Sequence, residues 1–153
     1  MILTTRSSYG VRALINVAIL HQSGKPVSVR TVAREEGISE IYLEQIFNCL
    51  KKRGILKATR GPRGGYALAS DPAEITVYDV VMALEESLAP GKCSGRSGEC
   101  CEKASRCVSK EVWDAVENNV KKTLMGYTLK SLAERAVEVN PCREAKVKLF
   151  ESR

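Results

Sequence analysis

The sequence is poor in the residue types that many enzyme sites need. It has 1 histidine, His21, in 153 residues, and aromatic residues make up 5% of the chain. With one histidine there is no Ser-His-Asp or Cys-His arrangement for nucleophilic catalysis, and no glycine-rich phosphate loop stands between a strand and a helix. We therefore expect a protein that is not an enzyme, with a core built mainly from aliphatic side chains.

Long apolar runs are also missing. No stretch is long enough to span a bilayer, and the first residues, Met-Ile-Leu-Thr-Thr-Arg, lack the apolar segment of a secretory signal. These absences predict a cytoplasmic protein with no membrane partner. The net charge of +6 favours a polyanionic partner, and the hydrophobic fraction of 44% is typical of a folded globular chain.

Cysteine, by contrast, is concentrated in one place. Of the 6 cysteines, Cys93, Cys100, Cys101 and Cys107 lie in a short segment rich in glycine and serine. In the cytoplasm, clustered thiols are more typical of metal ligands or redox sensors than of structural disulfides. The segment predicts a soft metal centre such as an iron–sulfur cluster; zinc is less favoured because the paired Cys-x2-Cys of zinc sites is absent, and a thiol–disulfide switch stays open. Cys49, on a predicted helix, we interpret as a half-buried residue and not as a ligand.

Apolar periodicity and capping residues divide the chain into short helices. Ser28, Ser39, Thr76 and Thr128 stand where N-cap residues are expected, and Gly37 stands where a glycine ends a helix. The predicted helices cover residues 5–22, 29–36, 40–53, 77–84, 109–125 and 129–138. Short strands are predicted over residues 55–59 and 65–69.

The helices on either side of Gly37 form a helix-turn-helix pattern. The second of them has an apolar stripe and, on another face, a polar row that consists of Glu44, Gln45, Asn48 and Lys52. Between the strands, Arg60-Gly-Pro-Arg-Gly-Gly65 makes a tight basic turn whose arginines can enter a minor groove or hold phosphates. The predicted fold class is mainly α with a small β wing: a winged helix-turn-helix DNA-binding domain followed by a long dimerisation helix.

The long helix carries an apolar stripe at steps of three and four residues. Its members are Trp113, Val116, Val120, Leu124 and Tyr127. Such a seam suits helix–helix packing within the subunit or across a dimer, and we interpret it as a dimer seam. The chain is thus divided into a winged helix-turn-helix domain (1–85), a cysteine-rich cluster-binding loop (86–108), a dimerisation helix with a short C-terminal helix (109–140) and a flexible charged tail (141–153).

Several motifs together resemble a bacterial winged-helix regulator family. They are Leu3-Thr-Thr-Arg6, Tyr9-Gly-Val-Arg-Ala13, Gly37-Ile-Ser-Glu-Ile-Tyr-Leu-Glu-Gln-Ile-Phe47, Leu50-Lys-Lys-Arg-Gly-Ile-Leu56 and Arg60-Gly-Pro-Arg-Gly-Gly-Tyr66, followed by the cysteine segment and Glu111-Val-Trp113. The family includes the iron–sulfur regulator IscR, the nitric-oxide sensor NsrR and the cysteine-metabolism regulator CymR. IscR-like members are the nearest match, over residues 1 to 135.

The resemblance implies a homodimer that binds a pseudo-palindromic operator in double-stranded DNA. It places Glu44 and Gln45 in the major groove and Arg60 in the minor groove, and the full set of implied DNA-binding residues is Ser39, Ile41, Glu44, Gln45, Asn48, Arg60 and Arg63. Because a carboxylate is repelled by base acceptors and phosphates, Glu44 could select against some operators. The implied cofactor is an iron–sulfur cluster of the 2Fe–2S type.

Two features of the cysteine segment depart from the family pattern. The family has five residues in each gap between three cysteines; Cys101 and Cys107 fit this spacing, but Cys93 lies two residues too far upstream. Where IscR has a histidine three residues after the last cysteine, this chain has Lys110, whose ammonium has no lone pair. We assign the cluster to Cys93, Cys101 and Cys107. Cys100 is the fourth or alternate ligand, and Glu99, Glu102 or a residue from elsewhere remain open.

Besides a cluster-sensing regulator, the residues are compatible with two other functions. A thiol-redox or nitric-oxide-responsive repressor would share the fold and use the cysteines differently. A small iron–sulfur electron-transfer protein would need no basic wing, which argues against that function.

Overall fold

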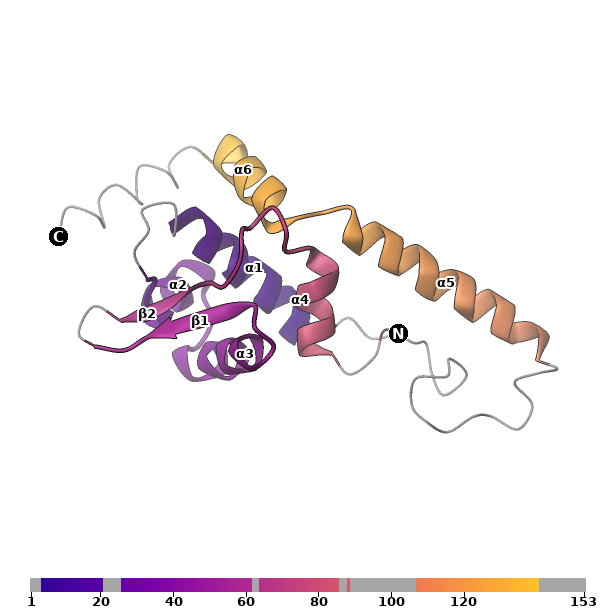
Figure 1. The fold of residues 1–153 in the computed structure, drawn as a ribbon, viewed down its shortest axis with the longest axis horizontal. Helices are drawn as coiled ribbons and strands as arrows, with labels where there is room; N and C mark the ends of the chain where they lie inside the picture. Colours follow the sequence, from indigo (N-terminus) through magenta and orange to yellow (C-terminus); the bar gives the residue numbers. More distant parts are fainter. Residues whose placement is uncertain (1–3, 21–25, 62–63, 86–87, 89–106, 141–153) are drawn as a thin grey trace.

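The structure is a computed structural model that describes residues 4–20, 26–61, 64–85, 88 and 107–140. Its elements follow in the order α1 (Thr5–Leu20), α2 (Val29–Glu36), α3 (Glu40–Lys52), β1 (Leu56–Thr59), β2 (Gly65–Leu68), α4 (Val77–Leu84), α5 (Val108–Met125) and α6 (Leu129–Val139), as Figure 1 shows. The predicted fold class, mainly α with a small β wing, is confirmed. None of the helices in the described part of the chain has both the length and the apolar character that crossing a bilayer demands.

The predicted caps set the helix boundaries. The hydroxyls of Ser28, Ser39, Thr76 and Thr128 each accept a hydrogen bond from the backbone N–H three residues on. Gly37 has φ 66°, the left-handed conformation that glycine adopts without a steric penalty, and so it ends α2 and allows the tight turn into α3. These short-range signals are why the sequence located the helices to within a residue or two.

The main core lies around α1, which packs against α2, α3, α4 and α6. The apolar stripe of α3 is fully buried, with Leu43, Ile46, Phe47 and Leu50 all 0% exposed. On α1, Leu14, Val17 and Ala18 are buried as the periodicity predicted; His21, the next member of that face, lies outside the described residues. Because one face of α3 is buried in this way, its opposite face is fixed toward solvent.

The wing is an antiparallel pair of strands in which Leu56 lies opposite Leu68 and Thr59 opposite Gly65. Tyr66 also exchanges two backbone hydrogen bonds of 2.8 Å with Val27, just before α2. A Cβ on Gly65 would lie 2.5 Å from the carbonyl oxygen of Val27, so glycine permits this close approach. The wing is therefore attached both to α3 through the chain and to the start of α2 through its backbone.

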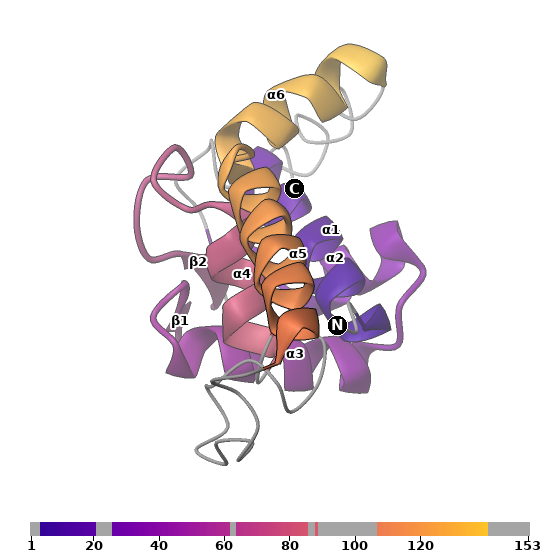
Figure 2. The same cartoon turned by 90° about the vertical axis from the view of Figure 1, so that its right-hand side faces the viewer.

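Helix α5 projects away from this body as an arm (Figures 1 and 2). None of its residues is buried. Near its C-terminal end, Val120 and Leu124 pack on a small cluster that contains Val77 and Val81 of α4. Of the predicted seam, Trp113 and Tyr127 remain 40% and 52% exposed. Val120 and Leu124 of the stripe thus pack within the subunit, while Trp113 and Tyr127 keep much of their surface exposed.

A backbone ladder fixes the end of this arm. The N–H of Val77 donates to the carbonyl of Tyr127, and the N–H of Leu129 donates to the carbonyl of Ile75, both at 2.9 Å. Leu129 is 0% exposed and lies in the main core together with Ala133, so α6 packs on α1 beside the winged domain. The division of the chain into domains stays a prediction.

A buried carboxylate connects the first three helices. The side chain of Glu36 is 3% exposed. Its Oε2 lies 2.7 Å from both Nε and Nη2 of Arg12, and its Oε1 accepts a hydrogen bond from the Asn16 side chain. The Arg12 guanidinium also lies 5.7 Å from the centre of the Tyr9 ring, and Tyr9 meets Tyr42 of α3 edge-on with ring centres 6.1 Å apart. Charge and aromatic contacts thus connect α1, α2 and the start of α3.

A second carboxylate lies at the end of α4. One oxygen of Glu85 accepts hydrogen bonds from the hydroxyls of Thr4 and Ser7 and from the Thr4 N–H at 3.2 Å, at the N-terminus of α1. Partial burial raises the pKa of Glu85, but the Ser7 and Thr4 hydrogen bonds and the nearby Arg6 outweigh burial and lower it overall. The anion also suits the partial positive charge of a helix N-terminus.

Replacing Arg12 with methionine should destabilise the fold. Arg12→Met removes the Arg12 cation from the buried Glu36 carboxylate, and we expect a loss of about 2–4 kcal/mol in the free energy of unfolding, measured in urea. The double variant Arg12→Met, Glu36→Leu should recover much of that loss, because no buried charge remains. As a control, Arg30→Ala breaks the exposed 3.7 Å pair with Glu40 and should cost less than about 1 kcal/mol. Equal losses in the Arg12 and Arg30 variants would contradict this account.

Glu85→Gln should change how stability depends on pH. Because the folded pKa of Glu85 is lowered, its contribution is present above the unfolded pKa and is lost as pH falls through the folded value. Wild type should be more stable than Glu85→Gln by about 1 kcal/mol at pH 7, with the difference disappearing under acid conditions. Urea unfolding at several pH values measures this difference. A stability difference between wild type and Glu85→Gln that increased toward low pH would contradict this prediction.

Candidate nucleic-acid interface

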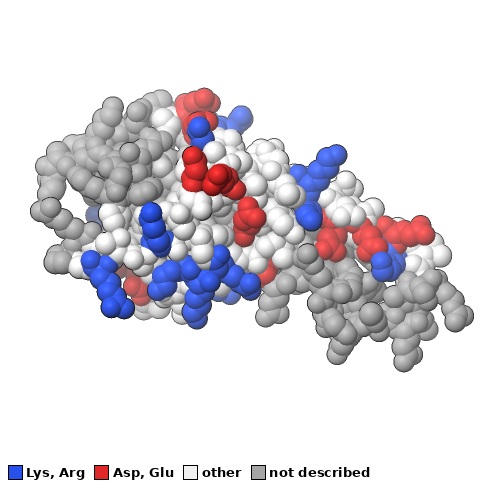
Figure 3. Space-filling model, in the orientation of Figure 1, with Lys and Arg blue, Asp and Glu red and all other residues white. Residues whose placement is uncertain are grey.

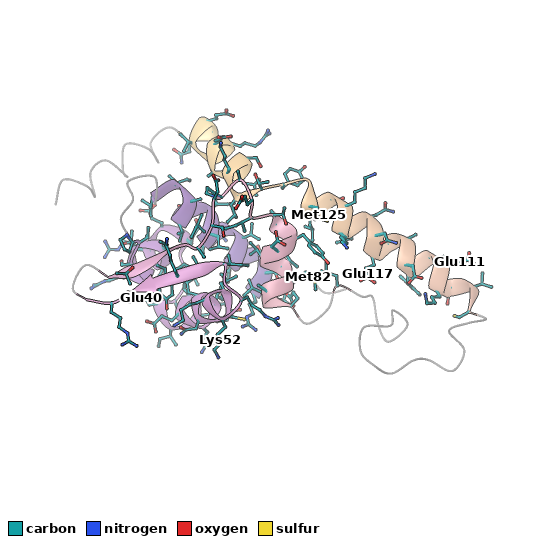
Figure 4. The ribbon with its side chains drawn as sticks, viewed as in Figure 1. Glu40, Lys52, Met82, Glu111, Glu117 and Met125 are labelled. Carbon is teal, nitrogen blue, oxygen red and sulfur yellow. The ribbon has the colours of Figure 1, made fainter. Side chains whose placement is uncertain are left out.

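The outward face of α3 carries the residues that the sequence proposed for DNA reading. Ile41, Glu44, Gln45 and Asn48 are all exposed. At about 100° per residue, Glu44, Gln45 and Asn48 lie within about 60° of Ile41 around the helix axis. Figure 4 shows Glu40 and Lys52 at the two ends of the same helix. The structure therefore brings four of the predicted residues together on one face.

Ser39 occupies a different position from these side chains. It is the N-cap of α3, and its hydroxyl accepts the N–H of Tyr42 at 3.2 Å. This bond satisfies one of the free backbone donors at the start of the helix. The exposed oxygen keeps a second lone pair and its own hydrogen, so Ser39 can still meet a phosphate or a base edge.

The wing supplies a basic edge beside α3. Arg60 follows β1 directly and is exposed, while Arg63 lies outside the described residues. Lys51 and Lys52 occupy the last turn of α3, and Lys57 is exposed on β1. Figure 3 shows blue side chains gathered over α3 and the strands, while red ones lie above them toward α6 and, mixed with blue ones, along α5. One side of the molecule thus joins a polar row to a positive surface, the arrangement that a phosphate backbone requires.

Tyr66 connects the wing to the exposed face of α3, and the sequence assigned it no role. Its hydroxyl donates to Oδ1 of Asn48 at 3.4 Å, and its ring meets Phe47 edge-on with centres 5.0 Å apart. Burial raises the pKa of Tyr66, and the negative charge of Glu44 raises it further. Tyr66 therefore remains a neutral hydrogen-bond donor at neutral pH. In the sequence, a local signal for this role is the position of Tyr66 directly after the basic turn; in the structure it lies opposite Ala58.

Of the four proposed cluster ligands, the structure describes Cys107 alone. Cys93, Cys100 and Cys101 lie outside the described residues. Cys107 is the residue immediately before α5, and its sulfur lies 3.0 Å from the Ser109 hydroxyl. That hydrogen bond lowers the pKa of Cys107, and the N–H groups of Lys110 and Ser109 lower it further against a small effect of burial. A thiol at a helix N-terminus is readily converted to the thiolate that binds metals.

Lys110 and Cys49 do not offer ligands. The ammonium of Lys110 binds Asp114 at 2.6 Å, and this partner raises the pKa of Lys110, so the group stays protonated. Cys49 is half-buried and donates to the carbonyl of Ala83 at 3.2 Å, as predicted for a packing residue. Among the residues that the structure describes, no group of three or more His, Cys, Asp or Glu side chains could hold a metal ion.

Comparisons with known proteins agree with this geometry. Residues 3–135 match the family model described as "Rrf2: Iron-dependent Transcriptional regulator". The chain is 40% identical over 136 residues to protein rrf2 of Nitratidesulfovibrio vulgaris, covering 89% of both chains. It is 37% identical over 132 residues to the HTH-type transcriptional regulator IscR of Photorhabdus laumondii, covering 86% of this chain and 79% of that protein.

Among solved structures, the fold is similar to that of T. potens IscR. The TM-score is 0.72 at 33% sequence identity, and the match covers 92% of this chain and 91% of the other. The relatives are named as regulators of transcription and not as enzymes, in agreement with the expectation from the sequence. By these matches the chain belongs to the Rrf2 family of transcriptional regulators.

Proposed function

We propose that this regulator binds double-stranded DNA with α3 in the major groove and the wing in the adjacent minor groove. The observation that carries the proposal is the exposed row of Glu44, Gln45 and Asn48 beside the basic wing edge. A helix fits the width of the major groove, and an arginine such as Arg60 suits the negative potential of a narrow minor groove. Arg63, next along the same turn, would add to the wing contact.

The arm is the surface that we assign to homodimer formation. Val108, Val112 and Trp113 are 79%, 58% and 40% exposed on the first half of α5. Exposed apolar side chains of this kind on a projecting helix are suited to pairing with the same helix of a second copy. A two-fold dimer presents two copies of α3, and such an arrangement reads a pseudo-palindromic operator.

We further propose that Cys93, Cys101 and Cys107 hold an iron–sulfur cluster of the 2Fe–2S type, with Cys100 as the fourth or alternate ligand. The support is the half-buried Cys107 at the N-terminus of α5, whose lowered pKa suits a metal-bound thiolate. Lys110 is held by Asp114 and contributes no lone pair, so the fourth ligand differs from a histidine at this position. A bound cluster would supply a centre that responds to iron or to oxidants.

Cys107 also connects the proposed cluster site directly to α5. It immediately precedes α5, whose other end is fixed to the body at Tyr127 and Leu129. A change at the cysteine site would therefore act on the first half of α5, which carries the proposed dimer face. In this way cluster loading would alter the spacing of the two α3 helices.

The same thiol chemistry favours a second function. A thiol of lowered pKa reacts with oxidants and disulfides more readily than an ordinary one, so the cysteines could act as a thiol-redox switch with no metal. The two functions predict different iron and sulfide contents in protein purified without oxygen.

Arg60→Ala should weaken binding to a duplex selected from a random library by the wild-type protein. We expect a loss of about 1–3 kcal/mol if Arg60 reads a groove feature, and a log–log dependence on salt of about −0.9 per phosphate contact. Fluorescence anisotropy measures both quantities. Lys130→Ala on α6 removes the same charge away from α3 and should leave affinity within about twofold, since rim charges remote from the DNA matter little. An Arg60→Ala variant with unchanged affinity for the duplex would contradict the proposed contact between the wing and DNA.

Protein purified without oxygen should contain iron and acid-labile sulfide in near-equal amounts and absorb visible light. Cys107→Ala should lose most of both, because a thiolate ligand is missing. Cys49→Ala, which removes a packing thiol, should keep them. Removing the cluster with a chelator should change affinity for the selected duplex. A colourless, iron-free wild-type protein that still binds the duplex would favour the thiol switch.

A further inference from the structure

Ile41 is exposed in a domain that otherwise covers its large apolar side chains. Its exposed fraction is 75%. Within the described part of the chain, the other large hydrophobic residues with high exposure belong to α5, α6 and the link between them: Val108, Val112, Trp113, Met125, Tyr127 and Val139. Those on the first half of α5 have an explanation as a dimer face. Ile41 has no such explanation, because it is on α3.

Ile41 lies at the part of α3 that, in helix-turn-helix proteins, contacts DNA bases. It lies in the first turn of the helix, two residues after the capping Ser39. Tyr42 and Leu43 turn toward the core, while Gln45 and Asn48 share the face of Ile41. In helix-turn-helix proteins, the N-terminal residues of the recognition helix are the ones that contact base edges.

The chemistry of isoleucine restricts what it can contact there. Its side chain has no donor or acceptor, so it cannot read the polar groups of guanine, adenine or cytosine. The apolar group that an unmodified base pair presents in the major groove is the 5-methyl of thymine. A β-branched residue also has a lower helix propensity than alanine or leucine, so an exposed isoleucine offers α3 no compensating gain in stability.

We propose that Ile41 recognises the 5-methyl group of a thymine in each half-site of the operator. The proposal rests on the proposed DNA-binding function and adds to it the base that this position selects. Gln45 and Asn48 would provide hydrogen bonds to neighbouring bases, while Ile41 provides the apolar contact. The surrounding face of α3 is polar, with Lys51 and Lys52 in its last turn and Lys57 on the wing, which favours DNA over an apolar protein partner as the occupant.

Replacing single thymines with deoxyuridine tests this directly, because uracil lacks only the methyl group. The probe is the duplex selected by wild-type protein from a random library, and the measurement is the dissociation constant by fluorescence anisotropy. Wild type should bind about fourfold more weakly when the critical thymine of one half-site is changed, the expected effect of one buried methyl group. Changing both half-sites should weaken binding by about 16-fold.

The Ile41→Ala variant should bind the thymine duplex more weakly and should no longer distinguish thymine from uracil at that position. Ile41→Val should keep part of the distinction. Val139→Ala shortens an equally exposed apolar residue, 77% exposed on α6, and should leave both affinity and distinction unchanged. Thermal unfolding of each variant checks that the fold is retained.

Two results would overturn the inference while leaving DNA binding intact. One is a selected duplex in which no thymine-to-uracil change affects wild type. The other is an Ile41→Ala variant that distinguishes thymine from uracil as well as wild type does. A wild-type protein that selects no duplex at all would instead overturn the proposed function, and this inference with it.

Discussion

The buried carboxylate of Glu36 is the constraint on which the arrangement of α2 and α3, the helices that we propose meet DNA, depends. It lies at the end of α2, one residue before the left-handed glycine that turns the chain into α3. Removing a carboxylate from water is costly unless it is paired, and Arg12 and Asn16 of α1 supply the pairing. Because both partners come from one turn of α1, the end of α2 can occupy only one position along that helix. The direction of α3 follows from that position.

Weaker contacts extend this constraint to the interface itself. Arg12 stacks on Tyr9, Tyr9 meets Tyr42, and the buried stripe of α3 fixes the rotation of that helix. On the other side, Tyr66 connects the wing to Asn48 and Phe47. Helix α3, which we propose for DNA recognition, and the wing are therefore held against the same core. A site of this kind reads DNA by presenting side chains whose places are set before binding.

Much of this architecture could be predicted because its signals are local. Caps such as Ser39 and Thr76, the left-handed Gly37 and the stripe ending at Leu50 act within a turn or two of their own helix. The family prediction is also confirmed. The pairs Arg12–Glu36, Asn48–Tyr66 and Thr4–Glu85 could not be predicted, since nothing in the pattern of a single helix indicates which distant residue will face it. For the same reason the sequence could not show which residues of the α5 stripe pack within the subunit. In the structure Val120 packs against α4, whereas Trp113 remains 40% exposed.

Methylation of the selected duplex by dimethyl sulfate tests the central claim, that α3 enters the major groove while the wing enters the minor groove. The reagent modifies N7 of guanine in the major groove and N3 of adenine in the minor groove, so one experiment reports on both. We expect protected guanine N7 atoms in two half-sites about one helical turn apart, with protected adenine N3 atoms beside each. Protection in one groove only, or at a single half-site, would contradict the account.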